Sequence, residues 1–460
     1  MAVGSGLILA GPLDTAAALV RLVPSGEFWG QVAFSALRIV GGAAAGYVCA
    51  FALAAVAWRW SAVRTLLQPA LSAIKGTPVA CVVVLLLIWI GSRNVSAVAV
   101  FLMVLPGVYF PVLTGLDELD EGQRELFQAF GAGRMTRLLA HVWPGILPYV
   151  TAASRTVLGM SWKAGVAAEL IGVPAGSIGE RIYQAKLLLE TADLFAWTIV
   201  VVLISWAFER GVLALLNASV PIGDRLLLAH AGHGVRSSTS SGSPGDVTSF
   251  GVKAEKLEIG YDGKLVCSPA TFEVKPGYTL CLMAPSGTGK TTLLRTLAGL
   301  QEPLAGRVEH VGETGTAGAD TLHGANSGQA VGMVFQDTRL IERLTAIENV
   351  YLLAGGACDE RRTRDLLSEL LPAEVLDAPV RELSGGQQRR VELARAFASQ
   401  ASLVLLDEPF TGLDAETHRQ ALSFIRRHQG NRAIVLATHD RKDVQALEAE
   451  TLALNVRKNL

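Results

Sequence analysis

The residues with the clearest chemical role lie in one glycine-rich loop, which reads Ala284-Pro285-Ser286-Gly287-Thr288-Gly289-Lys290-Thr291-Thr292. An apolar run precedes this loop and a helical pattern follows it, so the sequence predicts a strand, a phosphate-binding loop and a helix. In such a loop the backbone N–H groups and the helix N-terminus face an anion, Lys290 reaches the β- and γ-phosphates of a nucleotide, and Thr291 holds Mg²⁺. The loop predicts a nucleoside triphosphate site, and a glycine-rich turn with an unrelated lysine is the alternative.

One position departs from the pattern G-x-x-x-x-G-K-[ST], because Ala284 stands where the first glycine is expected. If this position needs a positive φ, the alanine Cβ adds strain of about 1 kcal/mol. That loss is small beside several charged hydrogen bonds to a triphosphate, so the nucleotide prediction stands.

Two carboxylates follow an apolar run further along the chain. Residues 403–406 predict a buried parallel strand, which presents Asp407 to Mg²⁺. Glu408 comes next, and a carboxylate there can polarise the attacking water as a general base. Between the loop and this strand, Leu383-Ser384-Gly385-Gly386-Gln387 places a serine and two glycines at the start of a helix, which also suits phosphate oxygens.

In their chain order, these motifs resemble the nucleotide-binding domain of ATP-binding cassette (ABC) transporters, over residues 250–460. The resemblance implies an α/β P-loop fold with ATP and Mg²⁺ as ligands. It implies that Glu408, His439 and Gln336 act in catalysis, and that Thr291, Gln336 and Asp407 hold Mg²⁺. The ATP-binding residues that it implies are Tyr261, Ser286, Gly287, Thr288, Gly289, Lys290, Thr291, Thr292, Ser384, Gly385, Gly386, Gln387 and Asp414.

The same resemblance implies that a second copy of the chain completes each site. Each ATP would lie between Lys290 of one copy and the Ser384 segment of the other, with Asp414 linking the two sites. Tyr261 would stack on adenine, although a hairpin turn with an exposed aromatic is the alternative. His439 would contact the γ-phosphate, and its position after the apolar strand 433–437 favours that role over a strand-end histidine in a satisfied hydrogen bond.

The composition points to a membrane-embedded part. The chain has 460 residues, enough for two or three domains, of which 18% are charged, and its mean hydropathy is +0.38. A net charge of −1 gives no reason to expect nucleic acid. The five cysteines show no C-x-x-C spacing, so we interpret them as reduced thiols that pack as small apolar groups.

Five apolar runs predict membrane spans at 34–57, 66–90, 95–116, 146–171 and 194–216. The first would be about 36 Å long as a helix, which is enough to cross a bilayer. Residues 1–27 hold neither a clear signal peptide nor a span, and predict an N-terminal arm. Buried helices of a large soluble protein are the alternative. Because the ATP-binding part must face the cytoplasm, five crossings place the N-terminus outside.

The polar segment between the third and fourth runs predicts a short amphipathic helix that ends in a turn. It resembles the coupling loop of ABC importer permeases, in which Glu125, Gly131 and Pro144 match the pattern while Leu126 and Phe127 replace two alanines. The resemblance implies that this loop lies in a groove of the ATP-binding domain near Gln336 and transmits its closure.

Charged residues within the predicted spans are expected to face a cavity or a partner, because a central charge costs about 2.5–3.5 kcal/mol on insertion scales. Lys75, Lys163 and Glu169 are therefore candidates for lining a transport pathway. Snorkelling to the cytoplasmic headgroups is the alternative for Lys75 and for Arg155.

Residues 28–218 resemble the permeases for nitrate, taurine and alkanesulfonates, through 86–91, the coupling loop, 167–172 and 176–179. This resemblance implies a membrane α-helical domain of the type I importer kind, an external substrate-binding protein and a small-molecule solute, such as the small anions sulfonate or nitrate. It also implies a bacterial inner membrane, with the ATP-binding domain in the cytoplasm. Those permeases usually carry an extra first span, and relatives also move bicarbonate, thiamine precursors and riboflavin.

A Ser/Gly-rich stretch within 219–249 predicts a flexible linker between the two parts. The sequence thus predicts an N-terminal arm (1–27), a permease domain (28–218), the linker and an ATP-binding cassette domain (250–460). We expect a homodimeric, ATP-driven importer. An ABC exporter would have six spans with long intracellular helices, and a soluble ABC ATPase that acts on ribosomes would have two cassettes and no spans.

Overall fold

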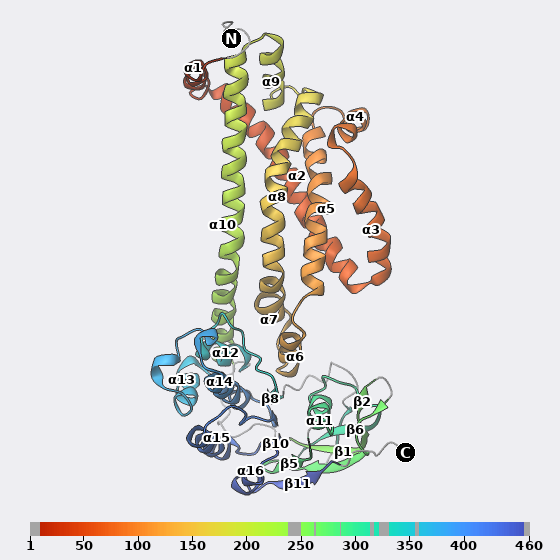
Figure 1. The fold of residues 1–460 in the computed structure, drawn as a ribbon, viewed down its shortest axis with the longest axis vertical. Helices are drawn as coiled ribbons and strands as arrows, with labels where there is room; N and C mark the ends of the chain where they lie inside the picture. Colours follow the sequence, from red (N-terminus) through yellow and green to blue (C-terminus); the bar gives the residue numbers. More distant parts are fainter. Residues whose placement is uncertain are drawn as a thin grey trace. The chain divides into compact units, whose positions relative to one another are not determined.

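The computed structural model describes residues 10–237, 250–261, 264–285, 287–312, 317–321, 331–354 and 358–454. The chain divides into two compact units, which we call the helical unit and the α/β unit (Figure 1). The helical unit contains Met1–Leu119 and Val142–Pro221, and the α/β unit contains Asp120–His141 and Ile222–Leu460. The segment between the two parts of the helical unit therefore folds with the α/β unit.

The helical unit is built around three long helices, α2, α5 and α8. Glycines let α2 and α5 approach closely, because a Cβ on Gly42 would lie 2.2 Å from the carbonyl oxygen of Ala97. Gly46 is equally restricted, since its Cβ would lie 2.8 Å from a methyl of Val104. The helices of this unit are α1 (Pro12–Leu22), α2 (Gly26–Arg59), α3 (Ser61–Gly76), α4 (Val79–Ile90), α5 (Val95–Asp117), α8 (Trp143–Gly172), α9 (Ile178–Leu187) and the first part of α10 (Thr191–Ser237).

The prediction of five membrane spans needs correction. Among the described residues, three helices are long and apolar enough to cross a membrane: Gly26–Arg59, Val95–Asp117 and Thr191–Ala229. A fourth is added if α3 and α4 count as one span, although they meet at a 102° bend. Pro78 accounts for this break, because proline has no N–H to continue a helix. Helix α8 forms over the predicted run 146–171, but it does not meet the same criterion.

The flexible linker predicted at 219–249 is wrong over its first part. Helix α10 continues through Ser237, and residues 238–249 lie outside the described residues. The helix persists because apolar residues continue past Pro221, and Leu227 among them is buried in the core of the α/β unit. In the predicted arm, α1 forms at Pro12–Leu22, and the hydroxyl of Ser25 caps α2 by accepting a hydrogen bond from the Phe28 N–H.

The α/β unit contains a five-stranded sheet of parallel pairs in the order β11-β5-β10-β9-β8. A four-stranded antiparallel sheet in the order β4-β1-β6-β7 and a small hairpin, β2-β3, complete its strands. The parallel strands are β5 (Thr279–Met283), β8 (Gly332–Val334), β9 (Leu403–Asp407), β10 (Ala433–Ala437) and β11 (Glu450–Ala453). The others are β1 (Phe250–Glu258), β2 (Gly260–Tyr261), β3 (Lys264–Leu265), β4 (Ala270–Val274), β6 (Ala305–Gly312) and β7 (Ala317–Thr321).

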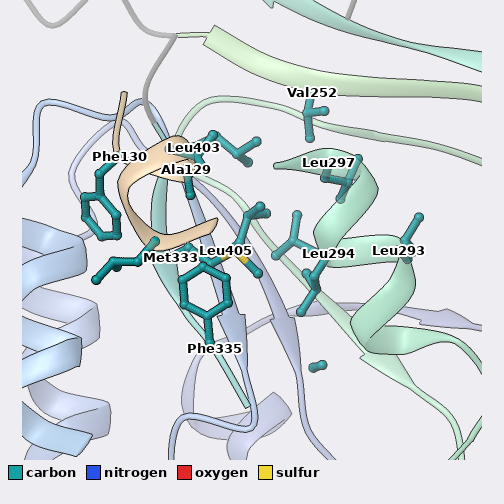
Figure 2. Packing of buried hydrophobic residues seen from close by; sticks show 14 of the residues in the cluster. Ala129, Phe130, Val252, Leu293, Leu294, Leu297, Met333, Phe335, Leu403 and Leu405 are labelled. Carbon is teal, nitrogen blue, oxygen red and sulfur yellow. The ribbon is translucent and has the colours of Figure 1, made fainter. Parts of the chain in front are cut away.

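The core of the α/β unit explains why two central strands read as unbroken apolar runs. Every residue of β9 and β10 is buried, as expected for strands covered on both faces. Figure 2 shows Leu403 and Leu405 of β9 beside leucines of the helix after the phosphate loop. The helices of this unit are α6 (Glu121–Ala129), α7 (Arg134–Arg137), α11 (Lys290–Leu297), α12 (Ala346–Leu353), α13 (Glu360–Ser368), α14 (Gly385–Ala398), α15 (Ala415–His428) and α16 (Arg441–Ala446). The predicted fold class, a helical domain joined to an α/β P-loop domain, is confirmed.

Candidate nucleotide site and coupling helix

The parallel sheet gathers the predicted catalytic segments at one edge. Strands β5, β9, β10 and β8 run in the same direction, and the register pairs Ala437 with Asp407 and Leu282 with Ala437. The residues that follow these strands therefore emerge together at their carboxyl ends, where ligands bind in sheets of this kind. The phosphate loop follows β5, Glu408 follows β9, His439 lies just beyond β10, and Gln336 lies just beyond β8.

The phosphate loop folds as its glycines require. Gly287 and Gly289 both have left-handed φ values, 81° and 94°, and Gly289 caps α11. The Lys290 ammonium is buried and donates to the carbonyl oxygens of Ala284, at 2.6 Å, and Pro285, at 3.2 Å. The loop thus holds its cation in place at the N-terminus of α11, next to where phosphates would bind. Ser286, also a predicted ATP ligand, lies outside the described residues.

Ala284 is accommodated without the strain that its position could have caused. Its φ is not left-handed, unlike those of Gly287 and Gly289. The residue packs against the core cluster of the α/β unit. The alanine therefore fits the loop, and no positive φ has to be imposed on it.

Three oxygen-bearing side chains converge where Mg²⁺ was predicted. The Thr291 hydroxyl donates to Gln336 Oε1 at 3.3 Å, and Thr291 also lies near enough to the Asp407 carboxylate to influence its pKa. Asp407 is buried, and its Oδ2 has no hydrogen-bond partner among the described residues. Burial raises the pKa of Asp407, with a smaller contribution from the nearby Glu408 charge. A hard divalent cation prefers oxygen ligands and would satisfy the orphaned oxygen, so these residues fit Mg²⁺.

Replacing Asp407 with asparagine should stabilise the nucleotide-free protein while removing a ligand for the metal. Because the pKa of Asp407 is raised in the folded protein, its ionised carboxylate destabilises the fold. The full cost applies at pH values above the folded pKa, and no cost remains below the ordinary pKa of an aspartate. At neutral pH the variant should therefore be more stable than the wild type. The melting temperature of the full chain in detergent checks this, and the gap from the wild type should narrow as the pH falls. A lower melting temperature for the variant at neutral pH would contradict it.

Glu408 and His439, which the sequence predicts to act in catalysis, lie beside each other. Glu408 has a left-handed φ of 46°, a strained conformation for a glutamate, and its N–H donates to the Ala437 carbonyl at 3.0 Å. Its Oε1 lies 3.8 Å from His439 Nδ1, and the His439 side chain is 76% exposed. Thr438 supports this segment by donating to the Asp443 carboxylate at 2.6 Å. The pair is positioned to polarise a water molecule at the open edge of the sheet.

Tyr261 lies in the β2-β3 hairpin, as one of the two interpretations of its sequence expected. Its ring is exposed, and its hydroxyl lies 3.3 Å from the Thr292 hydroxyl at the start of α11. The hairpin therefore holds an exposed aromatic beside the phosphate loop, where a base could stack. The Thr288 hydroxyl makes a hydrogen bond within the loop, donating to the Pro285 carbonyl at 2.7 Å.

The segment Leu383–Gln387, which we call the signature segment, opens α14 rather than joining the phosphate loop. Ser384 and Gln387 form a capping box, in which the Ser384 N–H donates to Gln387 Oε1 at 2.8 Å. Ser384 and Gly385 remain exposed. Among the described residues, no hydrogen bond joins this segment to Lys290 or Asp407. Asp414 likewise caps its own helix, α15, and accepts from the N–H groups of Glu416 and Thr417, an arrangement that lowers its pKa.

The segment that resembles a coupling loop docks on the α/β unit through α6. Glu125 accepts hydrogen bonds from Arg295, on the helix after the phosphate loop, at 3.0 Å from Nη1 and at a shorter contact from Nη2. It also accepts from Arg339 Nη1 at 2.7 Å, three residues beyond Gln336. The Val331 N–H, just before β8, donates to the Ala129 carbonyl at the end of α6. One carboxylate thus contacts both the phosphate-loop helix and the Gln336 loop.

The two residues that departed from the alanine pattern explain how α6 is seated. Leu126 and Phe127 are fully buried in the core cluster of the α/β unit, where Ala129 and Phe130 also pack (Figure 2). Gly131 ends the helix with a left-handed φ of 63°. Pro144 lies in the first turn of α8, in the helical unit. These two larger side chains therefore anchor α6 in the core of the α/β unit.

Sequence reasoning missed Arg295 and Arg339 as partners of Glu125. Neither belongs to a predicted motif, and both are ordinary positions on a helix and a loop. The available signal was positional: Arg295 comes five residues after Lys290, and Arg339 follows Gln336 by three. Only the fold shows that both guanidinium groups meet one carboxylate.

The charged residues that the sequence placed within membrane spans differ in their surroundings. Lys163 lines a cavity of about 260 Å³, together with apolar residues of α4, α5 and α8. Lys75, in the last turn of α3, is exposed, and its Nζ lies 5.8 Å from the Phe110 ring centre. Arg155 is also exposed.

Glu169 does not line that cavity, contrary to the pathway-lining role predicted for it. It is fully buried, and its Oε2 accepts from the Ser35 hydroxyl at 2.7 Å and from the Gly179 N–H at 3.3 Å. It ties α8 to α2 and to the start of α9, because the chain turns sharply after Gly172 and brings α9 against it.

Two family models match the chain. Residues 42–218 match a family described as the binding-protein-dependent transport system inner membrane component, and residues 267–411 match one described as ABC transporter. The helical and α/β units thus each contain a recognised domain, a permease and an ATPase.

Curated relatives and solved structures match the C-terminal part. The L-cystine transport system ATP-binding protein of Escherichia coli is 36% identical over 201 residues, which cover 41% of this chain and 80% of that protein. The thiamine import ATP-binding protein of a Jannaschia species is 35% identical over 193 residues, covering 40% and 82%. The dimeric structure of a bacterial ABC transporter cassette has a TM-score of 0.39 and 28% identity, covering 44% and 94%. Other curated import relatives are covered over only 57% of their length. The chain belongs to the ABC transporter family and joins an import-type permease domain to an ATP-binding cassette.

Proposed function

We propose that this chain is one half of a homodimeric importer, which hydrolyses ATP to bring a small solute across a bacterial inner membrane. An external substrate-binding protein would deliver the solute, and the cassette would face the cytoplasm. The observation that carries the proposal is an incomplete site: the phosphate loop, Asp407 and Glu408 lie together, whereas the exposed Ser384 segment caps a separate helix. A second copy would bring that segment to the nucleotide.

The residues at the sheet edge have separate tasks in this function. Lys290 and the N-terminus of α11 bind the phosphates, and Tyr261 offers a ring for the base. Thr291, Gln336 and Asp407 would hold Mg²⁺, which neutralises charge on the transferred phosphate. Glu408 accepts a proton from the attacking water, and His439 faces the same opening.

The contacts of α6 support coupling between hydrolysis and transport. Glu125 bridges Arg295 and Arg339, so a change at the phosphate loop or at Gln336 reaches the coupling helix through charged hydrogen bonds. This helix is continuous in sequence with α5 and α8 of the permease. Nucleotide-driven movement would therefore alter the connection between two membrane helices.

The cavity at Lys163 supports a small anion as the solute. Its walls are alanine, valine, isoleucine and methionine side chains, and Lys163 is the one charged residue among those that line it. Lys163 is exposed, and a cation beside an apolar cavity would favour an anion with a small apolar body, such as a sulfonate; nitrate fits the charge as well.

A co-expression experiment tests the shared ATP site. The wild type would be co-expressed with a chain that carries both Lys290→Ala and Ser384→Arg, and mixed dimers would be isolated through two affinity tags. Each site of a mixed dimer then contains one damaged half, so ATP hydrolysis should fall to the background of the double variant. If the wild-type partner kept its full rate, the shared-site proposal would be wrong.

The direction of transport needs a separate measurement. The full chain in lipid nanodiscs would be assayed for ATP hydrolysis with and without a candidate binding protein from a neighbouring gene. An importer should be stimulated when the binding protein carries its solute, whereas an exporter would respond to solute alone. Stimulation by solute without any binding protein would therefore favour the exporter.

A further inference from the structure

A second contact joins membrane-derived segments to the cassette, away from Glu125. Arg343 donates to Asp224 twice, from Nε to Oδ2 at 3.0 Å and from Nη2 to Oδ1 at 2.9 Å. Its Nη2 also donates to the Ala140 carbonyl at 3.0 Å. Asp224 belongs to the C-terminal part of α10, and Ala140 lies in the π-helical turn Leu138–Val142 that leads to α8. All three residues belong to the α/β unit.

This contact is largely shielded from water and is supported by apolar packing. The Asp224 side chain is 14% exposed and that of Arg343 is 27% exposed. Leu227, one helical turn from Asp224, is buried in the same core cluster as Ala140. A planar, bidentate arginine–carboxylate pair in such a setting is stronger than an exposed ion pair. The end of α10 is therefore fixed to the cassette by charge and by packing.

The loop that carries Arg343 is held rigid from within. Asn349 is buried, and its Oδ1 accepts from the Ile341 N–H at 2.8 Å. Its Nδ2 donates to the carbonyls of Ile341 and Thr345, at 3.1 and 3.0 Å. This loop begins directly after Gln336 and contains Arg339 as well as Arg343. One loop therefore contacts α6 through Arg339 and α10 through Arg343.

Helix α10 contains a proline close to the Arg343–Asp224 contact. Pro221 lies inside the helix and is the last residue of the helical unit, and Ile222 is the first of the α/β unit. Proline removes one helical hydrogen bond and bends or weakens a helix at that point. The last membrane helix thus continues across a weakened turn into a segment that is part of the cassette.

We propose that Arg343 is a positioning residue that makes α10 a second transmission element beside the coupling helix α6. Movement of the loop after Gln336 would pull on Asp224 and, through the turn at Pro221, on the membrane part of α10. This inference rests on ATP-driven transport, but it does not depend on the direction of transport or on the solute. It would let the fused chain transmit cassette movement to two membrane segments from a single loop.

Hydrogen–deuterium exchange of the full chain in nanodiscs tests this proposal, with and without ATP plus orthovanadate. In the wild type, addition of this probe should change exchange within residues 191–220. In Arg343→Ala, amides of residues 222–229 should exchange about tenfold faster or more, because charged hydrogen bonds are lost. The nucleotide-dependent change in 191–220 should disappear, while ATP binding persists.

The matched control is Arg364→Ala, which breaks a bidentate pair of the same kind with Asp377 on the surface of the same unit. It should leave the response of 191–220 intact. The swapped pair Asp224→Arg with Arg343→Asp should restore part of that response, which a purely structural defect would not allow. If Arg343→Ala released residues 222–229 but left the response of 191–220 unchanged, the proposal would be overturned. If the wild type did not hydrolyse ATP at all, that result would instead count against the proposed function.

Discussion

Replacing Glu408 with glutamine is expected to slow ATP hydrolysis by about 10²- to 10⁴-fold, the range typical for loss of a general base. Glutamine keeps the size of the side chain and can occupy the same backbone conformation, but it cannot accept the proton of the attacking water. Nucleotide binding should persist, because Lys290 and the N-terminus of α11 are unchanged. The variant should therefore accumulate the ATP-bound dimer.

The measurement is the hydrolysis rate of the full chain in nanodiscs, alongside binding of a fluorescent ATP analogue. Glu416→Gln is the matched control. It makes the same chemical change at Glu416, which is exposed in the first turn of α15. It should hydrolyse ATP at the wild-type rate. Full-speed turnover by Glu408→Gln would exclude Glu408 as the base, and loss of analogue binding would assign it a role in binding instead.

The sequence indicated which candidate ATP-site residues lie at one edge of the sheet, because their positions depend on local patterns. Asp407 ends a strand that an apolar run reveals, and Lys290 and His439 come after two others; parallel strands bring such ends to one edge. The positive φ of Glu408 was not predictable, since it depends on how the chain leaves β9. The strain lies at the predicted general base, where a fixed conformation is useful.

Features that depend on tertiary packing were predicted less well. The Ser/Gly-rich composition towards the end of 219–249 resembled a linker, yet burial of Leu227 and the Asp224–Arg343 pair keep the first part of this stretch helical. The run 66–90 is apolar throughout, but one missing N–H at Pro78 bends it. Glu169 has the charge of a pathway residue, but the turn between α8 and α9 buries it. Only the linker was decided by a partner distant in sequence, Arg343, whereas the other two were decided by nearby breaks in the helices.

Replacing Glu392 with alanine is expected to destabilise the α/β unit by about 3–5 kcal/mol, because it leaves two buried guanidinium groups without their counter-charge. Glu392 is fully buried and accepts from Arg389 Nη1 at 2.9 Å and from the Arg339 N–H at 2.6 Å. Arg395 Nη2 lies 3.6 Å from the same carboxylate, and burial lowers the pKa of Arg395 to about 10. The cluster lies on α14, the helix that the signature segment opens.

The same cluster fixes the loop that follows Gln336, so its loss should also be felt at the coupling contacts. Arg389 donates to the Gln336 carbonyl at 2.6 Å, and Arg395 donates to the Arg339 carbonyl at 2.6 Å. The temperature of half-inactivation of ATP hydrolysis follows the α/β unit, and it should fall by roughly 6–20 °C in Glu392→Ala. Glu392→Gln, which keeps an acceptor for the Arg339 N–H, should fall less. Asp377→Ala breaks only the exposed pair with Arg364 and should change little. If Glu392→Ala and Asp377→Ala were equally stable, the buried cluster would not be what holds α14 to this loop.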